Sequence, residues 1–115
     1  GNTQTKRDYI YVDSVIGAFI EVINKFNKNN NQVFNVGGGY AKSAIDIVNI
    51  IEGRILSYNK KYIYKKIVIN KNKIRHADRS ILLSDISKIK RDLNWKPVSL
   101  KTGLNKLLKK EGLVS

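Results

Sequence analysis

The stretch Arg7-Asp8-Tyr9-Ile10-Tyr11-Val12-Asp13 carries the clearest structural signal in this 115-residue chain. Its large residues from Tyr9 to Val12 predict a strand. Asp13 then stands where the N-cap of a helix belongs, because its carboxylate can accept hydrogen bonds from otherwise unpaired backbone amides. The helix should run to about Phe26 and turn one apolar stripe toward a core, formed by Val15, Ile16, Phe19, Ile20 and Ile23.

A second unit of strand, turn and helix follows. Gln32 to Val36 predicts a short strand, and Gly37-Gly38-Gly39 ends it with residues that can adopt positive φ. Ser43 and Asp46 have the spacing of a capping box, so we expect a helix to begin at Ser43. The buried stripe of that helix should be Ala44, Ile47, Val48, Ile51 and Ile55.

The rest of the chain predicts two further extended segments and two further helices. Ile63 to Ile69 favours an exposed or edge strand, because lysines interrupt its β-branched residues, and Ser80 to Leu83 should also be extended. Asp85 can cap a helix that ends at Leu93, after which Pro97 forces the chain to turn. The last helix, capped by Ser99, would have an apolar face made of Leu100, Leu104, Leu107 and Leu108.

This alternation of strands and helices predicts the α/β class. The strands are too few for a complete doubly wound sheet, so we expect residues 1–115 to form one region with a small mixed sheet and helices. The unpaired edges of such a sheet need a partner, and the chain begins directly before a strand, without a cap or turn. We therefore expect the chain to be truncated, with more polypeptide upstream.

Composition limits the classes of protein that fit. A chain of 115 residues with 42% hydrophobic content can bury one core. The absence of cysteine excludes a disulfide framework and a thiolate metal site, and makes the reducing cytoplasm the expected location. No apolar run reaches the roughly 20 residues that span a bilayer. The net charge of +13 would attract nucleic acid or phosphorylated ligands, but lysines scattered in this way are also typical of a solvated surface.

Four side chains have the chemistry to bind a nucleotide. Arg7 and Arg75 could each hold a diphosphate through paired, charge-assisted hydrogen bonds. Asp78 could accept hydrogen bonds from ribose hydroxyls, and Tyr9 could contact sugar or phosphate. Taken singly, these residues would be interpreted as a surface ion pair and a charged loop. As an ordered set they predict a phosphate-binding pocket.

Three other candidates have simpler interpretations. The turn from Gly37 to Gly39 lacks both the GxGxxG pattern and the later acidic residue of a dinucleotide loop, so we expect a structural turn. His76 is the only histidine and has no acid-base partner in a motif, which favours a place in the pocket wall over catalysis or metal binding. Trp95 could stack on a base, or it could belong to the core.

Several segments, in this order, resemble the carboxy-terminal region of NAD-dependent sugar epimerases and dehydratases, the extended short-chain dehydrogenases. They are Arg7 to Asp13, Val33-Phe34-Asn35-Val36-Gly37, Arg75-His76-Ala77-Asp78, Asp85-Ile86-Ser87-Lys88 and Leu93-Asn94-Trp95-Lys96-Pro97. In detail they look most like CDP-paratose (CDP-tyvelose) 2-epimerases, which would serve polysaccharide synthesis. The resemblance implies part of a Rossmann-type fold, with the amino-terminal NAD-binding domain absent from this chain. It also implies that Trp95 packs in the core between the last two helices.

The resemblance also implies a function. In the family this region grips the nucleoside diphosphate of a nucleotide-sugar, and the residues that match its contacts are Arg7, Tyr9, Arg75 and Asp78. Catalysis there needs a Y-x-x-x-K pair on a helix, whereas Tyr62 and Lys66 have this spacing in a predicted strand. We therefore expect no catalytic residue, and no activity from the chain alone. The complete enzyme would be a cytoplasmic isomerase that binds NAD through its missing part and, as is common in the family, a homodimer.

Two alternatives stay open. A related nucleotide-sugar 4,6-dehydratase or reductase would use the same grip, since the catalytic residues that distinguish them lie upstream. A small basic nucleic-acid-binding module would need a contiguous basic face with exposed aromatics, and its binding would weaken steeply with salt. The sequence has neither a recognised nucleic-acid motif nor clustered aromatics. The expected partner is thus a nucleotide-sugar, with no nucleic acid and no membrane.

Overall fold

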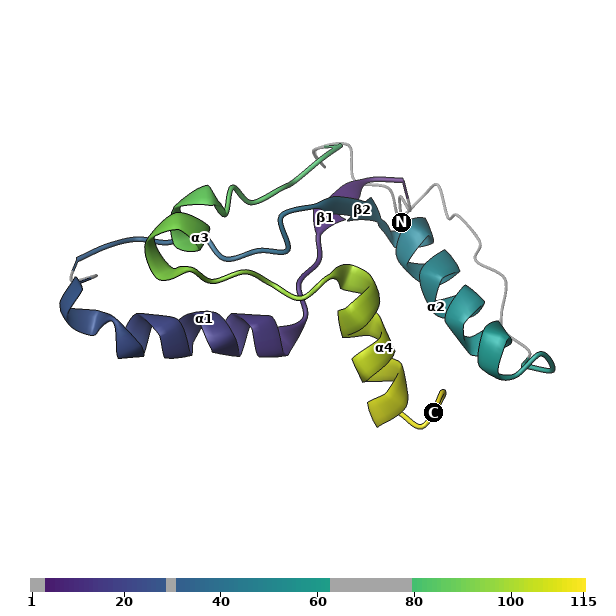
Figure 1. Ribbon diagram of the computed structural model, residues 1–115. Coiled ribbons are helices and arrows are strands. Elements are labelled where there is room, and N and C mark those ends of the chain that lie inside the picture. Colours follow the sequence, from purple (N-terminus) through teal and green to yellow (C-terminus); the bar gives the residue numbers. More distant parts are fainter. Residues whose placement is uncertain (1–3, 29–30, 63–79) are drawn as a thin grey trace.

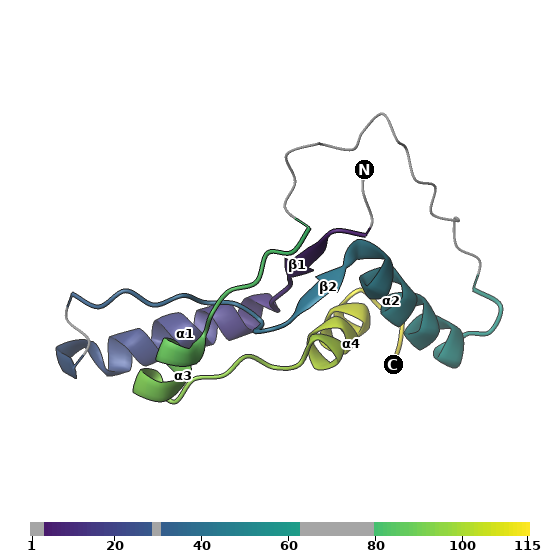
Figure 2. The same ribbon diagram turned by 90° about the horizontal axis from the view of Figure 1, so that it is seen from above.

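The computed structural model describes residues 4–28, 31–62 and 80–115. This part of the chain has two short strands, four α-helices and one 3₁₀ turn (Figure 1). Their bounds are β1 Lys6–Asp8, α1 Val12–Asn24, η1 Phe26–Lys28, β2 Ala41–Ser43, α2 Ala44–Tyr58, α3 Ser87–Leu93 and α4 Leu100–Lys110. The molecule is flat, with principal extents of 52 × 40 × 16 Å. Seen from above, α1 and α3 lie at one end, α2 and α4 at the other, and the strands between them (Figure 2).

The strands form a small mixed sheet around β1. In the antiparallel pair β1 and β2, Lys6 lies opposite Ser43, Arg7 opposite Lys42 and Asp8 opposite Ala41. On the other edge of β1, the Lys6 amide donates to the Ser80 carbonyl at 2.8 Å and the Leu82 amide to the Lys6 carbonyl at 3.0 Å. These bonds create a parallel bridge between Lys6 and Ile81. The mixed sheet and the extended segment that begins at Ser80 are therefore confirmed.

The strand predicted at Tyr9 to Val12 is wrong in position. Residues 6–8 form the strand because their pairing partners lie beside them, whereas Val12 already belongs to α1. The N-cap of α1 is Tyr11, whose carbonyl accepts from the Ser14 amide at 2.9 Å and whose side chain makes no capping bond. Asp13 is thus not the cap. It lies in the first turn, where a negative charge interacts favourably with the helix dipole.

The apolar stripe predicted on α1 does not face a core. Ile16, Phe19, Ile20 and Ile23 are each at least half exposed, and Val15 is only half-buried. The helix instead buries Ser14 and Ala18, because the elements that pack on it in the described part of the chain lie on that other face. The helix was predicted correctly, but its buried side was not.

Trp95 anchors the first of two cores. Its indole nitrogen donates to the Ser14 carbonyl at 3.0 Å, and the ring is 6% exposed. The core cluster comprises Ala18, Ile86, Ile89, Leu93 and Trp95. Asn94 takes a left-handed conformation with φ of 51°, which ends α3 and turns the chain into this position. The burial expected for Trp95 is confirmed, but the ring packs against α1 and α3 and not between the last two helices.

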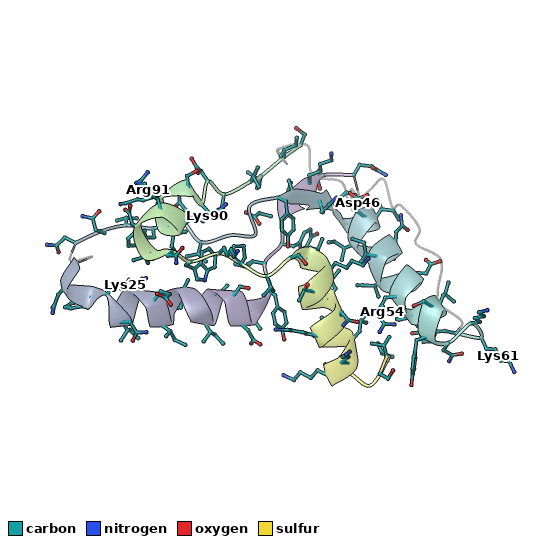
Figure 3. The ribbon with its side chains drawn as sticks, in the orientation of Figure 1. Lys25, Asp46, Arg54, Lys61, Lys90 and Arg91 are labelled. Carbon is teal, nitrogen blue, oxygen red and sulfur yellow. The ribbon has the colours of Figure 1, made fainter. Side chains whose placement is uncertain are left out.

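The second core joins α2 to the carboxy-terminal end. Ile55, Leu108 and Val114 are buried together. The Arg54 guanidinium, which lies between α2 and α4 in Figure 3, donates to Asn105 Oδ1 at 2.8 Å. The remaining apolar positions predicted on α2 are half-buried, and on α4 Leu107 is exposed. Each core is therefore small.

Both predicted serine caps are present. The Ser43 hydroxyl accepts from the Asp46 amide at 3.2 Å, and Asp46 Oδ2 accepts from the Ser43 amide at 3.0 Å, which completes a capping box at α2. The Ser99 hydroxyl accepts from the Thr102 amide at 3.1 Å at the start of α4. These caps satisfy amides that have no partner inside the helix.

Three other predictions in the loops have different outcomes. Gln32 to Val36 forms no strand, because no strand among the described residues pairs with it. Asp85 precedes the N-cap, which is Ile86, and accepts from the Ser87 amide at 3.0 Å and the Ser87 hydroxyl at 2.6 Å. These bonds lower the pKa of Asp85. The strand predicted at Ile63 to Ile69 lies outside the described residues.

Truncating the Trp95 side chain should unfold or strongly destabilise the domain. Trp95→Ala removes a buried aromatic ring and the donor to the Ser14 carbonyl, at an expected cost of about 3–5 kcal/mol. Trp95→Phe should cost less because most of the volume stays. Urea unfolding followed by circular dichroism measures both. A loss below about 1 kcal/mol for Trp95→Ala would contradict the packing role.

The capping box should make stability depend on pH. Hydrogen bonds from Ser43 lower the pKa of Asp46 below its usual 3.8, so the folded state favours the charged carboxylate. This contribution is complete above the unfolded pKa and is lost as pH falls through the lower folded pKa. We therefore expect wild type to be more stable than Asp46→Asn at pH 7, with the difference shrinking below pH 3.8. Urea unfolding across this pH range tests it, and a difference that stays constant would disprove it.

Candidate functional site

The Asp8 carboxylate joins three segments of the chain. Asp8 Oδ1 accepts from the Gly38 amide at 2.6 Å, and Oδ2 accepts from the Ser84 amide at 3.1 Å. Asp8 ends β1, Gly38 belongs to the glycine turn, and Ser84 follows the segment that pairs with β1. Both oxygens of this carboxylate therefore accept hydrogen bonds from backbone amides. Asp8 in this way fixes the positions of the glycine turn and the Ser84 segment beside Arg7.

The glycine turn approaches Asp8 too closely for a side chain. A Cβ added to Gly37 would collide with Asp8 Oδ2 and with the Ser84 side chain. A Cβ added to Gly38 would collide with the Tyr9 carbonyl. The Gly38 amide, which a phosphate would need, already donates to Asp8. The turn does not fit a dinucleotide, and its expected structural role agrees with this geometry.

A cavity of about 640 Å³ opens beside this turn. It is lined by residues 38–40, 83–87 and 96–99 together with Lys90. Within the described part of the chain, the Tyr40 hydroxyl oxygen is buried and has no hydrogen-bond partner. Burial, and then the nearby Asp8 charge, raise the pKa of Tyr40, so its phenol stays neutral at physiological pH. Lys90 and Lys96 are the lysines among the residues that line this cavity.

Arg7 occupies the middle of β1 and is half-buried. Its guanidinium donates to the Lys6 carbonyl at 2.9 Å. Lys42 lies opposite it on β2, and the Ser80 to Leu82 segment pairs with its neighbour Lys6. The sheet therefore holds Arg7 between two extended neighbours, with two lysines close by.

Tyr9 lies in a different environment. It lines an apolar cavity of about 270 Å³ between the segment that follows β1 and α4, with Ile47 of α2. Arg7 is not among the residues that line this cavity. Arg75 and Asp78, like His76, lie outside the described residues. Of the four predicted contacts, the structure thus describes Arg7 and Tyr9 and does not bring these two to a common cavity.

The described residues offer no metal site and no membrane segment. No group of three or more His, Cys, Asp or Glu among them could hold a metal ion. In the same part of the chain, no helix is long and apolar enough to cross a membrane.

The sequence alone did not reveal the structural role of Asp8 or the cavity near Tyr40. Asp8 stands next to Arg7, so a surface ion pair was the simpler interpretation, and its amide partners are 30 and 76 residues away. The cavity takes its walls from three separated segments. The one available signal was the pairing of an acidic residue with a Gly-Gly turn, which needs close backbone approach.

The architecture is similar to part of the fold of a class of enzymes. Two solved structures have a similar fold. The UDP-glucose 4-epimerase of Thermotoga maritima, solved with UDP-glucose, has a TM-score of 0.68 and 30% identity over 96% of this chain and 34% of its own. The RMD protein of Pseudomonas aeruginosa, complexed with NADPH, has a TM-score of 0.70 and 18% identity over 95% of this chain and 33% of its own. The fold is that of Rossmann-type epimerases and short-chain dehydrogenases.

The chain belongs to the GDP-mannose 4,6 dehydratase family, whose model matches residues 1–110. The dTDP-4-dehydro-6-deoxyglucose reductase of Escherichia coli is 28% identical over 110 residues, covering 95% of this chain and 32% of that protein. The chain therefore spans about a third of the length of the relatives it matches. The epimerase and dehydratase family inferred from the motifs is confirmed, and the CDP-paratose subfamily stays a prediction.

Removing the Asp8 carboxylate should loosen the site. Asp8→Ala leaves the Gly38 and Ser84 amides without their acceptor, at an expected cost of about 2–3 kcal/mol in unfolding free energy. Asp8→Asn keeps one acceptor oxygen and should cost less. Urea unfolding measures the loss, and hydrogen exchange at the Gly38 and Ser84 amides localises it. Unchanged protection of these two amides in Asp8→Ala would contradict the role of Asp8.

Proposed function

We propose that this chain is the substrate-binding part of an NAD-dependent nucleotide-sugar epimerase and grips the nucleoside diphosphate. One observation carries the proposal. Arg7 lies in the middle of the mixed sheet, and its neighbour Lys6 hydrogen-bonds to Ser80, which is two residues after Asp78 in the sequence. The sheet thus brings Arg7 beside the described end of the segment that carries the second predicted arginine and its aspartate.

Charge supports the same ligand. Arg7 lies opposite Lys42, so these two cations share one face of the paired strands, and the charges of Lys42 and Lys6 also interact with Asp46. Asp8, the acid nearest in sequence, accepts two backbone amides. A diphosphate carries the negative charge that Arg7 and Lys42 would attract.

The proposed contacts have distinct roles. Arg7 and Arg75 neutralise the diphosphate, and Asp78 accepts from the ribose hydroxyls. Tyr9 is proposed as a further contact, which would reach the ligand from the separate cavity that it lines beside α4. The glycine turn does not fit a dinucleotide, so we propose that NAD is bound by the rest of the enzyme.

The finer assignments belong to the same proposal. The chain's own motifs favour a CDP-sugar, while the solved relative from Thermotoga maritima binds UDP-glucose. The relative from Escherichia coli is a reductase, so a reductase or a 4,6-dehydratase with the same grip is the second candidate function. We further propose a cytoplasmic enzyme that acts in polysaccharide synthesis, and a homodimer when complete.

The nucleic-acid-binding alternative has less support. Membership of the family favours a nucleotide-sugar, and not a nucleic acid, as the phosphorylated ligand. The described cations next to Arg7 lie on two strands of three residues each. Binding of a single-stranded oligonucleotide that weakens steeply with salt, with no binding of nucleotide-sugars, would favour it.

Charge removal at the two arginines should weaken nucleotide-sugar binding. Arg7→Ala and Arg75→Ala are each expected to raise the Kd for UDP-glucose or CDP-glucose at least about tenfold, because each removes charge-assisted hydrogen bonds to the diphosphate. Isothermal titration of the 115-residue chain with both sugars measures this and ranks the two bases.

Arg91→Ala is the matched control. Arg91 lies on α3, its side chain is 70% exposed, and it pairs with its neighbour Asp92 at 2.9 Å. Figure 3 shows it at the end of the molecule away from α2. Its loss should leave Kd unchanged. Equal losses in Arg7→Ala and Arg91→Ala would mean general electrostatic attraction instead of a site, and absence of binding in wild type would overturn the proposal.

A further inference from the structure

Helices α2 and α4 border a cavity of about 700 Å³, and the described residues that line it include none of those proposed to bind the nucleotide-sugar. On α2, Asn49, Gly53 and Ser57 follow one another at intervals of four residues, and on α4 Lys101 and Asn105 have the same spacing. Residues four apart lie on one face of a helix, so each helix contributes one face to the cavity. The volume is within the roughly 300–1,000 Å³ of small-molecule pockets.

Arg54 is half-buried in this lining, between the two helices (Figure 3), and no described carboxylate pairs with it. Its Nε donates to Asn105 Oδ1 at 2.8 Å, and its Nη1 donates to Ser57 Oγ at 3.4 Å. Both acceptors are neutral, so they orient the guanidinium without cancelling its charge. Neither bond uses Nη2, and the edge formed by Nη1 and Nη2 can still bind an oxyanion.

The polar part of the lining favours an anion. No acidic residue is among the described residues that line the cavity. Lys101 adds a second positive charge one helical turn before Asn105. Because Asn105 Oδ1 accepts from Arg54, the amide hydrogens of Asn105 remain as donors. An anion would therefore find donors on both helices.

The rest of the lining is apolar. Ile50 of α2 and Leu104 and Leu108 of α4 border the same cavity. An inorganic anion would leave these side chains facing water, whereas a ligand with an apolar body next to its charged group would cover them. The lining thus fits an amphiphilic anion.

Gly53 keeps the α2 side of the cavity open. It lies in the middle of a 15-residue helix, where glycine is less favourable than alanine because ordering its backbone costs more entropy. A Cβ added at Gly53 would meet no atom within 4 Å, so packing inside the described chain does not require a glycine there. A large side chain at this position would instead occupy space beside the cavity that a ligand needs.

We propose that this cavity is a binding site for a small organic carboxylate, distinct from the nucleotide-sugar site. A planar carboxylate matches the guanidinium of Arg54 through two parallel hydrogen bonds, and its single charge matches the single half-buried cation. Lys101, which is exposed, adds longer-range attraction. The apolar body of the ligand lies against Leu104 and Leu108. The inference does not depend on the proposed function, since the two sites share no described residue.

Benzoate is the probe, because it combines one carboxylate with a compact apolar ring. Amide chemical shifts of the ¹⁵N-labelled 115-residue chain locate the ligand during a titration. We expect saturable shifts concentrated in residues 49–57 and 99–108, which contain the lining. Benzyl alcohol, which lacks the charge, should produce no comparable shifts, and saturating UDP-glucose should leave the benzoate shifts unchanged.

Two variants separate a site from general attraction. Arg54→Gln removes the charge and Gly53→Leu fills the space, and each should raise the Kd for benzoate at least about tenfold. Gly53→Leu should not lower the Tm, because leucine is the better helix former and a Cβ there meets no atom within 4 Å. Arg91→Gln is the matched control, since this side chain is 70% exposed on α3, and it should leave the Kd unchanged.

Several results would overturn the proposal. They are the absence of saturable benzoate binding in wild type, equal losses in Arg54→Gln and Arg91→Gln, and full binding in Gly53→Leu. Inorganic phosphate that shifts the same residues as strongly as benzoate at equal concentration would overturn the choice of a carboxylate. Displacement of benzoate by UDP-glucose would show that the two sites are one. A chain that binds no UDP-glucose would contradict the proposed function and still allow every other benzoate measurement, so the two failures are distinguishable.

Discussion

The double hydrogen bond of the Asp8 carboxylate is the constraint on which the rest of the structure depends. One side chain at the end of a three-residue strand holds a turn 30 residues away and a loop 76 residues away. It acts together with the backbone pairing of β1, which also holds β2 after the glycine turn and the segment before Ser84 beside this strand. Arg7 keeps its place because its neighbour on the strand is fixed in this way. The candidate binding residue thus depends on a residue that need not touch the ligand.

The features that depend only on neighbouring residues, such as helix caps and a turn, were predicted correctly from the sequence. The Ser43 and Asp46 capping box, the Ser99 cap and the turn before Pro97 are each decided within four residues, and each is present. Helix positions followed from apolar periodicity. The strand was misplaced because pairing partners, which lie far away in sequence, decide which extended residues form a sheet. The exposed apolar residues of α1 showed that periodicity identifies an apolar face without saying what covers it.

The candidate site was predictable in its residue types but not in its geometry. A pair of arginines with an aspartate and a tyrosine is chemistry that the sequence displays, and membership of the GDP-mannose 4,6 dehydratase family agrees with it. The sequence could not reveal that Tyr9 lines a cavity beside α4, since that cavity depends on how α4 packs. Nor could it show that Asp8 accepts two backbone amides. Both facts arise from contacts between distant segments.

The separation of the two hydrophobic cores has a mechanical consequence. The Trp95 cluster and the Ile55 cluster share no residue, and the short mixed sheet lies between them. The molecule therefore has two separately packed ends, connected through the short mixed sheet that contains Arg7. A small twist of one end against the other would be concentrated at β1 and would move the guanidinium directly. Because α1 begins only a few residues after β1, a force applied at this helix can also reach the candidate binding residue through the backbone.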